Sequence, residues 1–350
     1  MRNIIQILPG YKPNIEAVAA NAEILGKYLL VKKIKSRFLI SDRDPSTHNH
    51  ELFGSKSSKL LDLLGKHKIT DVILHFSGYG YATRGLCFSL LKSLKKWKEK
   101  NKAHRLIVIF HDVYAVGPIY RSAFWTCLPQ IYIATNLLKL SDCAITSSRY
   151  YQSKLLSWIP NKKILLSPIY SNIREIKYNR KLNKRKKIAV IFGGVYQKKV
   201  LYADMLSNKK NYLSALSSLS VKQIVDIGPK VIGLKKIGHI PIKSIGIKSK
   251  NFISKLLSGA KAGLTFYAVH LMTKSTVVAS YASHGVLIVN FYKTNILKTN
   301  EFISGVNFVS NVDEKKKLNY QKIANRAEKL YKNNSPIKLA LLISRFIKKV

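Results

Sequence analysis

The chain of 350 residues is 47% hydrophobic and 10% aromatic, which excludes a disordered protein and provides enough material for two packed domains. Its formal net charge of +44 predicts attraction to phosphates, whether on a nucleotide-linked molecule, an anionic membrane or nucleic acid. The basic residues are spread along the chain and form none of the arginine–aromatic motifs of nucleic-acid-binding modules, so we expect no specific nucleic-acid partner.

The sequence also restricts the cellular compartment. Cys87, Cys127 and Cys143 are odd in number and form no C-x-x-C pair, which favours a reducing environment over a disulfide framework. No segment reaches the about 18 to 20 uninterrupted apolar residues of a membrane span. Pro9 and Gly10 end the N-terminal apolar run too early for a signal peptide. We therefore expect a cytoplasmic protein, with the inner face of an anionic membrane as a peripheral partner.

Strands and helices alternate through the first half of the chain, as apolar periodicity and capping residues indicate. The expected strands are 3–8, 38–40, 71–76, 106–110, 143–147 and 164–166. The expected helices are about 14–31, 59–66, 83–100, 122–140 and a short helix that ends at Trp158. Residues 171–187 are polar and hold a basic cluster, and we interpret them as an interdomain linker; a solvated charge run is favoured there over a dedicated binding patch.

The second half repeats the alternation. The expected strands are 188–192, 223–227, 237–241, 263–267 and 286–291, and the expected helices are about 199–206, 251–257, 275–283, 320–331 and 337–348. Two serial βαβ halves predict an α/β fold of two Rossmann-like domains, with parallel sheets that face each other across a cleft. The predicted domains are 1–170 and 188–350, the second including the closing C-terminal helices.

The most informative segment is the apolar run that ends in His111 and Asp112. Ligands of open α/β sheets bind outside the carboxyl ends of strands, so these two residues are the candidate catalytic groups. The alternative is that His111 only satisfies a backbone group at the end of the strand.

Two further strands of the first half end in glycine-containing turns. Gly10 and Tyr11 follow the first strand, and Gly78, Tyr79 and Gly80 follow the strand at 71–76. The spacing to the next glycine does not match G-x-G-x-x-G, so a dinucleotide cofactor is not expected. Tyr79, together with the tyrosine two residues later, could stack on a sugar ring, and packing of both rings inside the protein is an equally good interpretation.

Anion-binding residues are expected in the second half. Gly193 and Gly194 end its first strand and would admit a phosphate to backbone N–H groups, with Lys198 or Lys199 as the counter-charge. A stronger candidate is the helix start formed by Lys274, Ser275 and Thr276, which combines a positive charge, hydroxyls and free N–H donors. Simple N-capping explains the hydroxyls there equally well.

No metal site is predicted. Asp42 and Asp44 form a D-x-D sequence, but a proline follows at once and a turn is the better interpretation. His48 and His50 lie in a polar loop and are expected to be solvated, whereas His239 lies beside a strand of the second half.

Taken together, these motifs resemble the GT-B glycosyltransferases of the group 1 (family 4) lineage. Residues 108–112 and the following Gly-Pro loop resemble the acceptor and sugar contact of the first domain. Residues 237–241 and 252–264 resemble the region that holds the nucleotide base, which assigns His239 and Ile240 to the donor. Residues 274–289 resemble the helix and strand that grip the donor. The resemblance spans nearly the whole chain.

The resemblance implies a transfer of sugar from a nucleotide-diphosphate donor to a hydroxyl acceptor, with retention of configuration and without a metal or other cofactor. It implies a saccharide or lipid-linked acceptor, in the synthesis of a cell-envelope polysaccharide or glycolipid. One pattern of the family is absent: its two glutamates would fall at Met272 and Ser280, counted back from Gly285. A catalytically silent protein of the same fold, which binds sugars or acts as a scaffold, is therefore the main alternative, and a nonspecific nucleic-acid binder is the third.

Overall fold

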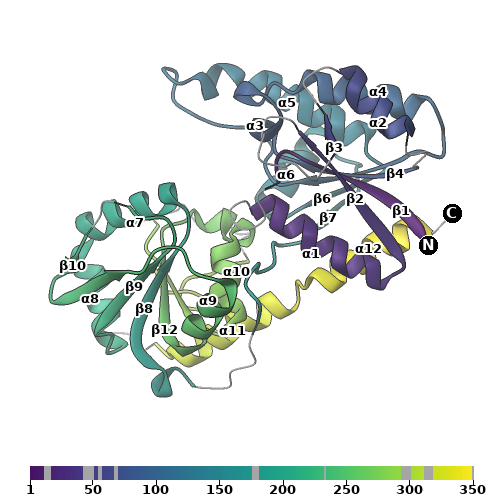
Figure 1. Cartoon of the computed structure of the whole chain (residues 1–350). Coiled ribbons are helices and arrows are strands. Elements are labelled where there is room, and N and C mark those ends of the chain that lie inside the picture. Colours follow the sequence, from purple (N-terminus) through teal and green to yellow (C-terminus); the bar gives the residue numbers. More distant parts are fainter. Residues whose placement is uncertain are drawn as a thin grey trace. The chain divides into compact units, whose positions relative to one another are not determined.

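The computed structural model describes residues 1–11, 17–41, 51–53, 57–66, 70–175, 181–231, 234–292, 301–310 and 318–348. The chain forms two compact units, each built on its own mainly parallel sheet (Figure 1). Unit 1 comprises Met1–Pro168 and Pro336–Val350, and unit 2 comprises Ile169–Ser335. The predicted pair of Rossmann-like halves is confirmed.

Among the described residues, unit 1 forms a seven-stranded sheet in the order β3-β2-β1-β4-β5-β6-β7, with neighbours parallel. Its strands are β1 (Arg2–Leu8), β2 (Ile34–Ser41), β3 (Glu51–Phe53), β4 (Asp71–Phe76), β5 (Arg105–Phe110), β6 (Cys143–Thr146) and β7 (Ile164–Leu166). Its helices are α1 (Ala17–Val31), α2 (Ser57–Lys66), α3 (Gly78–Tyr81), the 3₁₀ turn η1 (Thr83–Gly85), α4 (Phe88–Glu99), α5 (Ser122–Leu140), α6 (Arg149–Trp158) and α12 (Pro336–Lys348).

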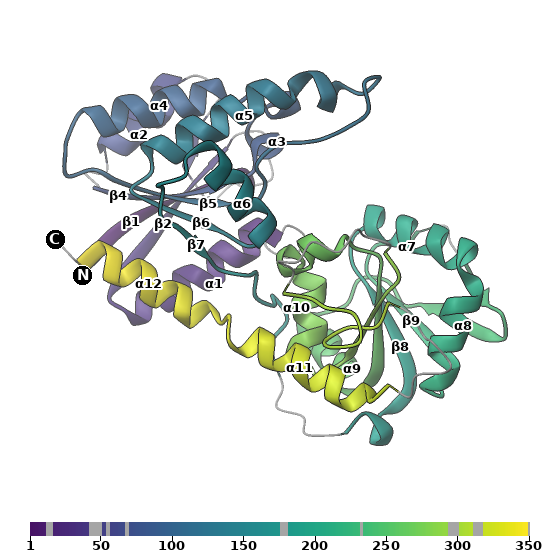
Figure 2. The same ribbon diagram turned by 180° about the vertical axis from the view of Figure 1, so that it is seen from behind.

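The strand order places a topological switch point between β1 and β4. The chain proceeds from β1 to β2 and β3 on one side, and from β4 to β7 on the other. Helices α2, α4 and α5 cover one face of the sheet and α1 and α12 cover the other (Figures 1 and 2). All six residues of β4 are buried, as expected for a parallel strand covered on both faces. Ligands of such sheets bind at the carboxyl ends of the strands beside the switch point.

The end of the chain returns to unit 1, which corrects the predicted boundary of 188–350. Helix α12 packs against α1. The carbonyl oxygen of Ile347 accepts hydrogen bonds from Arg2 (2.8 Å) and Arg105 (2.9 Å). Both guanidinium groups also pair with the buried carboxylate of Asp71. Cations at the C-terminus of a helix satisfy its last carbonyl groups, and these contacts explain why the helix belongs to unit 1.

Among the described residues, unit 2 forms a six-stranded sheet in the order β10-β11-β9-β8-β12-β13, parallel except for the β10–β11 pair. Its strands are β8 (Lys186–Phe192), β9 (Gln223–Ile227), β10 (Lys236–Ile237), β11 (Ile240–Ser244), β12 (Ala260–Thr265) and β13 (Leu287–Asn290). Its helices are η2 (Leu182–Lys184), α7 (Val195–Ser207), α8 (Lys209–Ser218), α9 (Lys250–Gly259), η3 (Val269–Lys274), α10 (Thr276–Ser283) and α11 (Tyr320–Lys332).

Side chains that alternate along the strands of unit 2 contribute to two apolar cores, one on each face of the sheet. Ala189 and Ile191 face the core formed with α7 and α8, whereas Val190 between them faces the core formed with α9 and α10. Successive side chains of a strand point to opposite faces, so a short apolar run is enough to build both layers. The switch point of this sheet lies between β8 and β12.

The predicted linker 171–187 is wrong in its first part. Unit 2 already begins at Ile169, whose N–H donates to the carbonyl oxygen of Thr273 (2.8 Å). Ser171 is buried, and its hydroxyl lies 2.9 Å from that of Ser280. A segment with buried hydrogen bonds is part of the folded unit, whatever its polarity. In the described part of the chain, no helix combines the length and the apolar character that crossing a membrane requires.

Candidate functional site

The turns after β1 and β4 meet at the switch point of unit 1. A Cβ placed on Gly80 would lie 2.3 Å from the Cβ of Pro9, so the two turns can approach this closely only because residue 80 is glycine. The structure thus brings together the two turns that hold the residues of the first half assigned to the acceptor side by the sequence. These are Gly10, Tyr11, Gly78, Tyr79 and Gly80.

The tyrosines of these turns have different surroundings. Tyr79 is 48% exposed and remains a candidate for stacking on a ligand. Tyr81 is buried, and its hydroxyl donates to the carbonyl oxygens of Ile7 and His75, so the packing interpretation holds for this ring. Burial accordingly raises the pKa of Tyr81. Tyr11 is half-buried and its hydroxyl donates to a glutamate of α1, which leaves its ring in a packing role.

His111 lies directly after β5 and is part of a buried chain of polar side chains. Its Nε2 is 3.1 Å from Nδ1 of His75, and Nε2 of His75 is 2.8 Å from Oε1 of Gln6. The amide nitrogen of Gln6 donates to Ser36 and to the carbonyl oxygen of Ala22, which fixes its oxygen as the acceptor. Gln6 and His75 were not predicted, although each is a polar residue inside an apolar strand.

The protonation of the two rings follows from this chain. Burial, and then the nearby His111, lower the pKa of His75 well below its usual value, so His75 is neutral and has one N–H group. That group donates to Gln6, and Nδ1 of His75 must accept a hydrogen bond from Nε2 of His111. In the neutral form of His111 the lone pair therefore lies on Nδ1, and the orientation of the ring is fixed.

Asp112 is held by groups from two other elements. Its carboxylate accepts a hydrogen bond from Ser77 after β4 (3.1 Å) and one from the hydroxyl of Tyr151 in α6 (3.4 Å). Burial, followed by the charge of Asp112, raises the pKa of Tyr151, so the tyrosine remains a donor. Asp112 is half-buried, and the two hydrogen bonds orient its carboxylate at the carboxyl edge of the sheet.

A cavity of 220 Å³ opens beside these residues. Gln130 of α5 supports its wall: the amide oxygen accepts from the N–H of Ala115 (2.7 Å), and the amide nitrogen donates to Arg84 O (2.8 Å) and approaches the hydroxyl of Tyr79 (3.4 Å). Asp112 and the ring of Tyr79 also line the cavity. Acceptors, donors and aromatic surface in one small cavity suit a hydroxyl-rich ligand. Gln130 had no signal in the sequence, because it lies in the middle of a helix.

In unit 2, the turns after β8 and β9 meet in the same way. Gly193 adopts φ +153° and Gly228 adopts φ +114°, and a Cβ on Gly228 would lie 2.7 Å from the carbonyl oxygen of Gly193. Gly194 precedes the first turn of α7 and would have no neighbour within 4 Å of an added Cβ. A Cβ on Gly193 would lie 3.7 Å from Val277 in the first turn of α10. The N-termini of two helices therefore converge on one pair of glycine turns.

The structure contradicts the prediction for Lys198. The side chain is 1% exposed, its ammonium group lies 2.7 Å from the carboxylate of Asp226, and it donates to the carbonyl oxygen of Pro229. Tyr202 donates to the second oxygen of the same carboxylate (2.8 Å). Lys198 thus holds the turn after β9 from inside and does not face a ligand. Lys199 is exposed, and its contact with a donor stays a prediction.

The predicted helix start at residues 274–276 is present, with the helix α10 beginning at Thr276. Ser275 is the N-cap: its hydroxyl accepts from the N–H of Val278 (3.3 Å), so the capping interpretation is confirmed for this residue. Lys274 is half-buried at the end of η3. Anion binding by Lys274, Ser275 and Thr276 stays a prediction that is compatible with the cap.

The predictions for His239 and Ile240 are wrong. Gly238 and His239 form the turn of the β10–β11 hairpin, and Ile240 is a buried first residue of β11. Since β11 is parallel to β9 with Ile242 opposite Ile224, this turn lies at the amino ends of the strands, the edge opposite the glycine turns. The carboxyl end of β11 leads instead to Gly246, whose carbonyl oxygen accepts from the N–H of Gly228 (3.0 Å). Residues 245–247, at this carboxyl end, were not among the predicted site residues.

The positions of the two absent family glutamates are both in the core of unit 2. Ser280 is fully buried, and its hydroxyl contacts that of Ser171 and donates to the carbonyl oxygen of Thr276 (2.7 Å). Met272 is 1% exposed, with its sulfur 3.4 Å from the amide nitrogen of Asn290. Neither residue can supply a carboxylate to a ligand, so any donor contact in this unit depends on backbone groups, hydroxyls and lysines.

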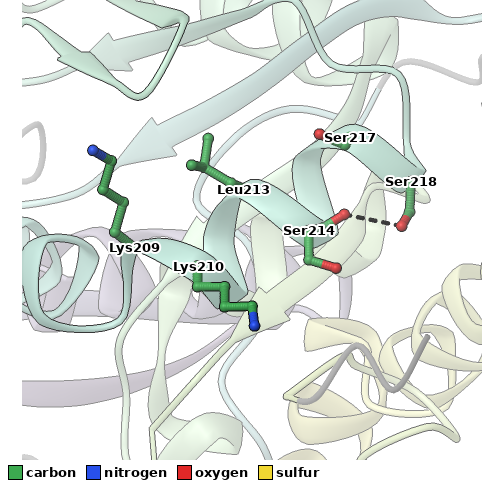
Figure 3. A pocket seen from close by; sticks show the side chains of 6 residues that line it. All are labelled: Lys209, Lys210, Leu213, Ser214, Ser217 and Ser218. Carbon is green, nitrogen blue, oxygen red and sulfur yellow. Dashed lines mark hydrogen bonds between the residues drawn. The ribbon is translucent and has the colours of Figure 1, made fainter.

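An open hollow of 810 Å³ lies over α8, lined by Lys209, Leu213 and neighbouring serines (Figure 3), and none of the predicted site residues lines it. No group of three or more potential metal-ligating side chains occurs in the described residues. Asp42, Asp44, His48 and His50 lie outside those residues.

No family model matches the sequence, and no curated protein matches it. Solved structures do match over the whole chain. An alpha-glucosyltransferase in complex with UDP-glucose and DNA has a TM-score of 0.61 at 10% identity, with 100% of both chains covered. A glycosyltransferase involved in avilamycin A biosynthesis has a TM-score of 0.55 at 12% identity, covering 100% of this chain and 99% of that chain.

A UDP-GlcNAc 2-epimerase from Neisseria meningitidis, bound to UDP-GlcNAc, also matches, with a TM-score of 0.57 at 12% identity and 99% and 100% of the two chains covered. At these identities the similarity establishes the fold. The chain has the GT-B fold, as its sequence predicted.

Proposed function

We propose that the chain is a glycosyltransferase that moves a sugar from a nucleotide-diphosphate donor to a hydroxyl acceptor. The observation that carries this proposal is the convergence of the N-termini of α7 and α10 on the glycine turns at Gly193 and Gly228. Free N–H groups and the positive ends of two helix dipoles at one point form an anion site. The UDP and UDP-sugar complexes among the structural neighbours support a nucleotide sugar as the ligand.

In the proposed reaction, unit 2 stabilises the leaving diphosphate. Negative charge develops on the leaving group as the bond to the sugar breaks, and preorganised N–H donors stabilise that charge most where it develops. Lys199 and Lys274 would add positive charge, and the hydroxyl of Thr276 an additional donor. We expect no metal requirement, because fixed cations and backbone dipoles can perform the same neutralisation.

Unit 1 would position the acceptor and the transferred sugar. His111 presents a ring of fixed orientation, and Asp112 presents a carboxylate oriented by two hydrogen bonds. Gly78 and Tyr79, which line the cavity, would contact the acceptor, and Gly10, Tyr11 and Gly80 would support that wall by packing. Transfer with retention of configuration is part of the proposal, with a donor phosphate oxygen rather than a side chain of the protein taking the acceptor proton.

Replacement of His111 with alanine tests the proposal. We expect turnover of the donor to fall by at least about tenfold, which corresponds to about 1.4 kcal/mol of lost transition-state stabilisation, while binding of the nucleotide to unit 2 is unchanged. Turnover measured with a radiolabelled nucleotide sugar, alongside nucleotide titration by calorimetry, separates the two. Unchanged turnover would remove His111 from the active site.

A catalytically silent protein of the same fold is the second candidate, favoured by the burial of Ser280 and Met272 where the family has glutamates. Calorimetry with a panel of nucleotide sugars discriminates between the two candidates. Binding without transfer to any saccharide or lipid-linked acceptor, and without hydrolysis, would support the silent protein. Binding with release of the nucleotide in the presence of one acceptor would support the enzyme.

The acceptor that we propose is a saccharide or a lipid-linked saccharide of a cell-envelope polysaccharide or glycolipid, reached from the cytoplasmic side. Duplex DNA belongs in the same acceptor screen, because a structural neighbour was solved in complex with DNA. A nonspecific nucleic-acid binder would lose affinity steeply with salt and would ignore free nucleotide sugars. Our proposal predicts instead that free nucleotide sugars bind to the protein.

A further inference from the structure

Helix α5 is apolar on both faces, although the protein covers only one of them. Ile133, Ala134, Leu137 and Leu138 are buried against unit 1. On the outer face, Phe124, Trp125, Leu128 and Tyr132 are 46%, 68%, 76% and 58% exposed. Trp125, Leu128 and Tyr132 lie one, four and eight positions after Phe124, so all four side chains lie on one side of the helix. A contiguous exposed apolar surface of this kind marks a site of interaction with a protein or a membrane.

The loop before α5 extends the exposed surface. Val116, Ile119 and Tyr120 are 75%, 61% and 82% exposed, and the indole N–H of Trp125 donates to the carbonyl oxygen of Ile119 (2.8 Å). The loop and the beginning of α5 project beyond the sheet of unit 1 (Figures 1 and 2). We call this surface the α5 face; it consists of Val116, Ile119, Tyr120, Phe124, Trp125, Leu128 and Tyr132.

We propose that the α5 face docks on an anionic lipid bilayer. Tryptophan and tyrosine are the side chains that favour the boundary between headgroups and acyl chains, and exposed aliphatic residues beside them can enter the acyl region. Between Val116 and Tyr132 the only charged side chain in the sequence is Arg121, whose long side chain can keep its guanidinium at the headgroups while the apolar residues enter the boundary.

The charges around the α5 face fit the same partner. Residues 78–140 contain ten lysines and arginines, against two acidic residues, Glu99 and Asp112. Eight of the ten remain after the pairing of Lys98 with Asp142 and of Arg105 with Asp71. Arg121 is exposed at the N-cap of α5, and Arg84 is exposed beside Gln130 of the same helix. Basic residues beside an apolar surface add attraction to anionic lipid headgroups. A single-stranded nucleic acid fits less well, because Arg121 is the one cation between these aromatic rings in the sequence, and valine, isoleucine and leucine offer no π-face for a base.

The α5 face also adjoins the candidate acceptor cavity. Gln130 lies between Leu128 and Tyr132 in the sequence and lines that cavity from the inner side of the helix, and Ala115 precedes Val116 in the loop. This part of the inference rests on the proposed function: a docked α5 face would bring the cavity to the membrane surface, where the sugar of a lipid-linked acceptor lies. The docking itself does not depend on any enzymatic activity.

Sedimentation of the full-length protein with vesicles tests the docking. We expect binding to vesicles of equal parts phosphatidylcholine and phosphatidylglycerol, and much weaker binding to phosphatidylcholine alone. The triple variant Phe124→Ser, Trp125→Ser, Leu128→Ser should bind the anionic vesicles at least tenfold more weakly, with an unchanged melting temperature because all three side chains are exposed. The matched control is Leu206→Ser, an exposed leucine of α7 in unit 2, which should bind as the wild type.

Tryptophan emission provides a second readout. Of the three tryptophans, Trp97 is buried and Trp158 is half-buried against the ring of Tyr114. Trp125 should therefore supply most of the shift to shorter wavelength on vesicle addition, and Trp125→Phe should lose that shift while still sedimenting. Equal binding of the triple variant and the wild type would overturn the proposal in favour of general charge attraction. Failure of the wild type to bind would also overturn it, and a loss of dimers in the triple variant would then assign the α5 face to self-association.

These outcomes are independent of the proposed function. Wild-type protein that transfers sugar to a soluble acceptor but ignores vesicles would refute the docking alone. Protein that binds vesicles through the α5 face but neither binds nor turns over nucleotide sugars would refute the proposed function alone.

Discussion

The carboxyl edges of the two sheets present different chemical groups: polar side chains in unit 1 and backbone groups in unit 2. In unit 1 the edge carries polar side chains that hold one another: His111 with His75, and Asp112 with Ser77 and Tyr151. In unit 2 the edge consists of glycine turns and helix N-termini. The one buried ion pair among the described residues of this edge, Lys198 with Asp226, lies beneath the surface.

Under the proposed function, this difference corresponds to different roles for the two switch points. Oriented side chains discriminate between hydroxyl groups and can move protons, whereas backbone N–H groups bind phosphate at a fixed position without a change in protonation. Under the proposed function, the chain can lack the two glutamates of the family that it resembles and still have an anion site in unit 2. The predictions below separate the structural from the ligand-binding part of each edge.

The largest effect is expected for Lys198→Met. The substitution leaves the Asp226 carboxylate buried with only Tyr202 as a side-chain donor, and loss of one partner of a buried ion pair costs about 3–5 kcal/mol. Urea unfolding of the variant measures this loss. Lys199→Met is the matched control, because Lys199 is exposed and its replacement should change stability by less than about 0.5 kcal/mol. Equal stability of both variants would contradict a structural role for Lys198.

The contrast between these adjacent lysines shows where sequence reasoning reached its limit. The strand ending in Gly193 and Gly194 and the helix after it could be predicted from periodicity, but the side of the helix that Lys198 occupies depends on Asp226, which is distant in the sequence. The same holds for His75 and Gln6. Polar residues inside two apolar strands could have indicated a buried network, but this was not predicted, and only the strand order shows that the two residues are neighbours.

Two further errors have identifiable physical causes. Gly238 and His239 were placed inside one strand, whereas a two-residue turn with a glycine at φ +57° joins two antiparallel strands there, a signal that hairpins commonly provide. The return of α12 to unit 1 depends on the arginines that contact Ile347, and nothing within the helix itself indicates them. Local patterns predict elements well, whereas contacts between distant segments decide domain boundaries and the edge of the sheet that a residue faces.

A second prediction separates stability from ligand binding at the glycine turns. Gly228→Ala puts a Cβ 2.7 Å from a backbone oxygen at a positive φ, and we expect a loss of about 1–3 kcal/mol. Gly194→Ala meets no atom within 4 Å and, as a change at the N-cap of α7, should cost less than about 1 kcal/mol. If phosphate approaches the start of α7, the Gly194 variant should nevertheless bind nucleotide sugars more weakly by calorimetry. Wild-type affinity would place the phosphate elsewhere.

A third prediction concerns pH. The pKa of His75 is lowered in the folded protein, so below pH about 6.5 the unfolded chain binds a proton that the folded chain does not. Stability should therefore fall as the pH decreases, by about 1.4 kcal/mol per pH unit for each such histidine. Burial also lowers the pKa values of His284 and His270 in unit 2. Urea unfolding between pH 7 and pH 5.5 should show a shallower dependence in His75→Gln, and an unchanged slope would contradict a neutral buried His75.

The smallest effect is expected for removal of one helix cap at each edge. Ser148 caps α6 in unit 1 and Ser275 caps α10 in unit 2, each by accepting an N–H of the first turn, at 3.2 and 3.3 Å. Both hydroxyls are buried, and replacing either serine with alanine should cost about 1 kcal/mol of stability. If α10 binds the donor diphosphate, only Ser275→Ala should also weaken nucleotide-sugar binding measured by calorimetry at a temperature where both variants are folded. Equal affinities of the two variants would separate the cap of α10 from the donor site, because capping alone affects both helices alike.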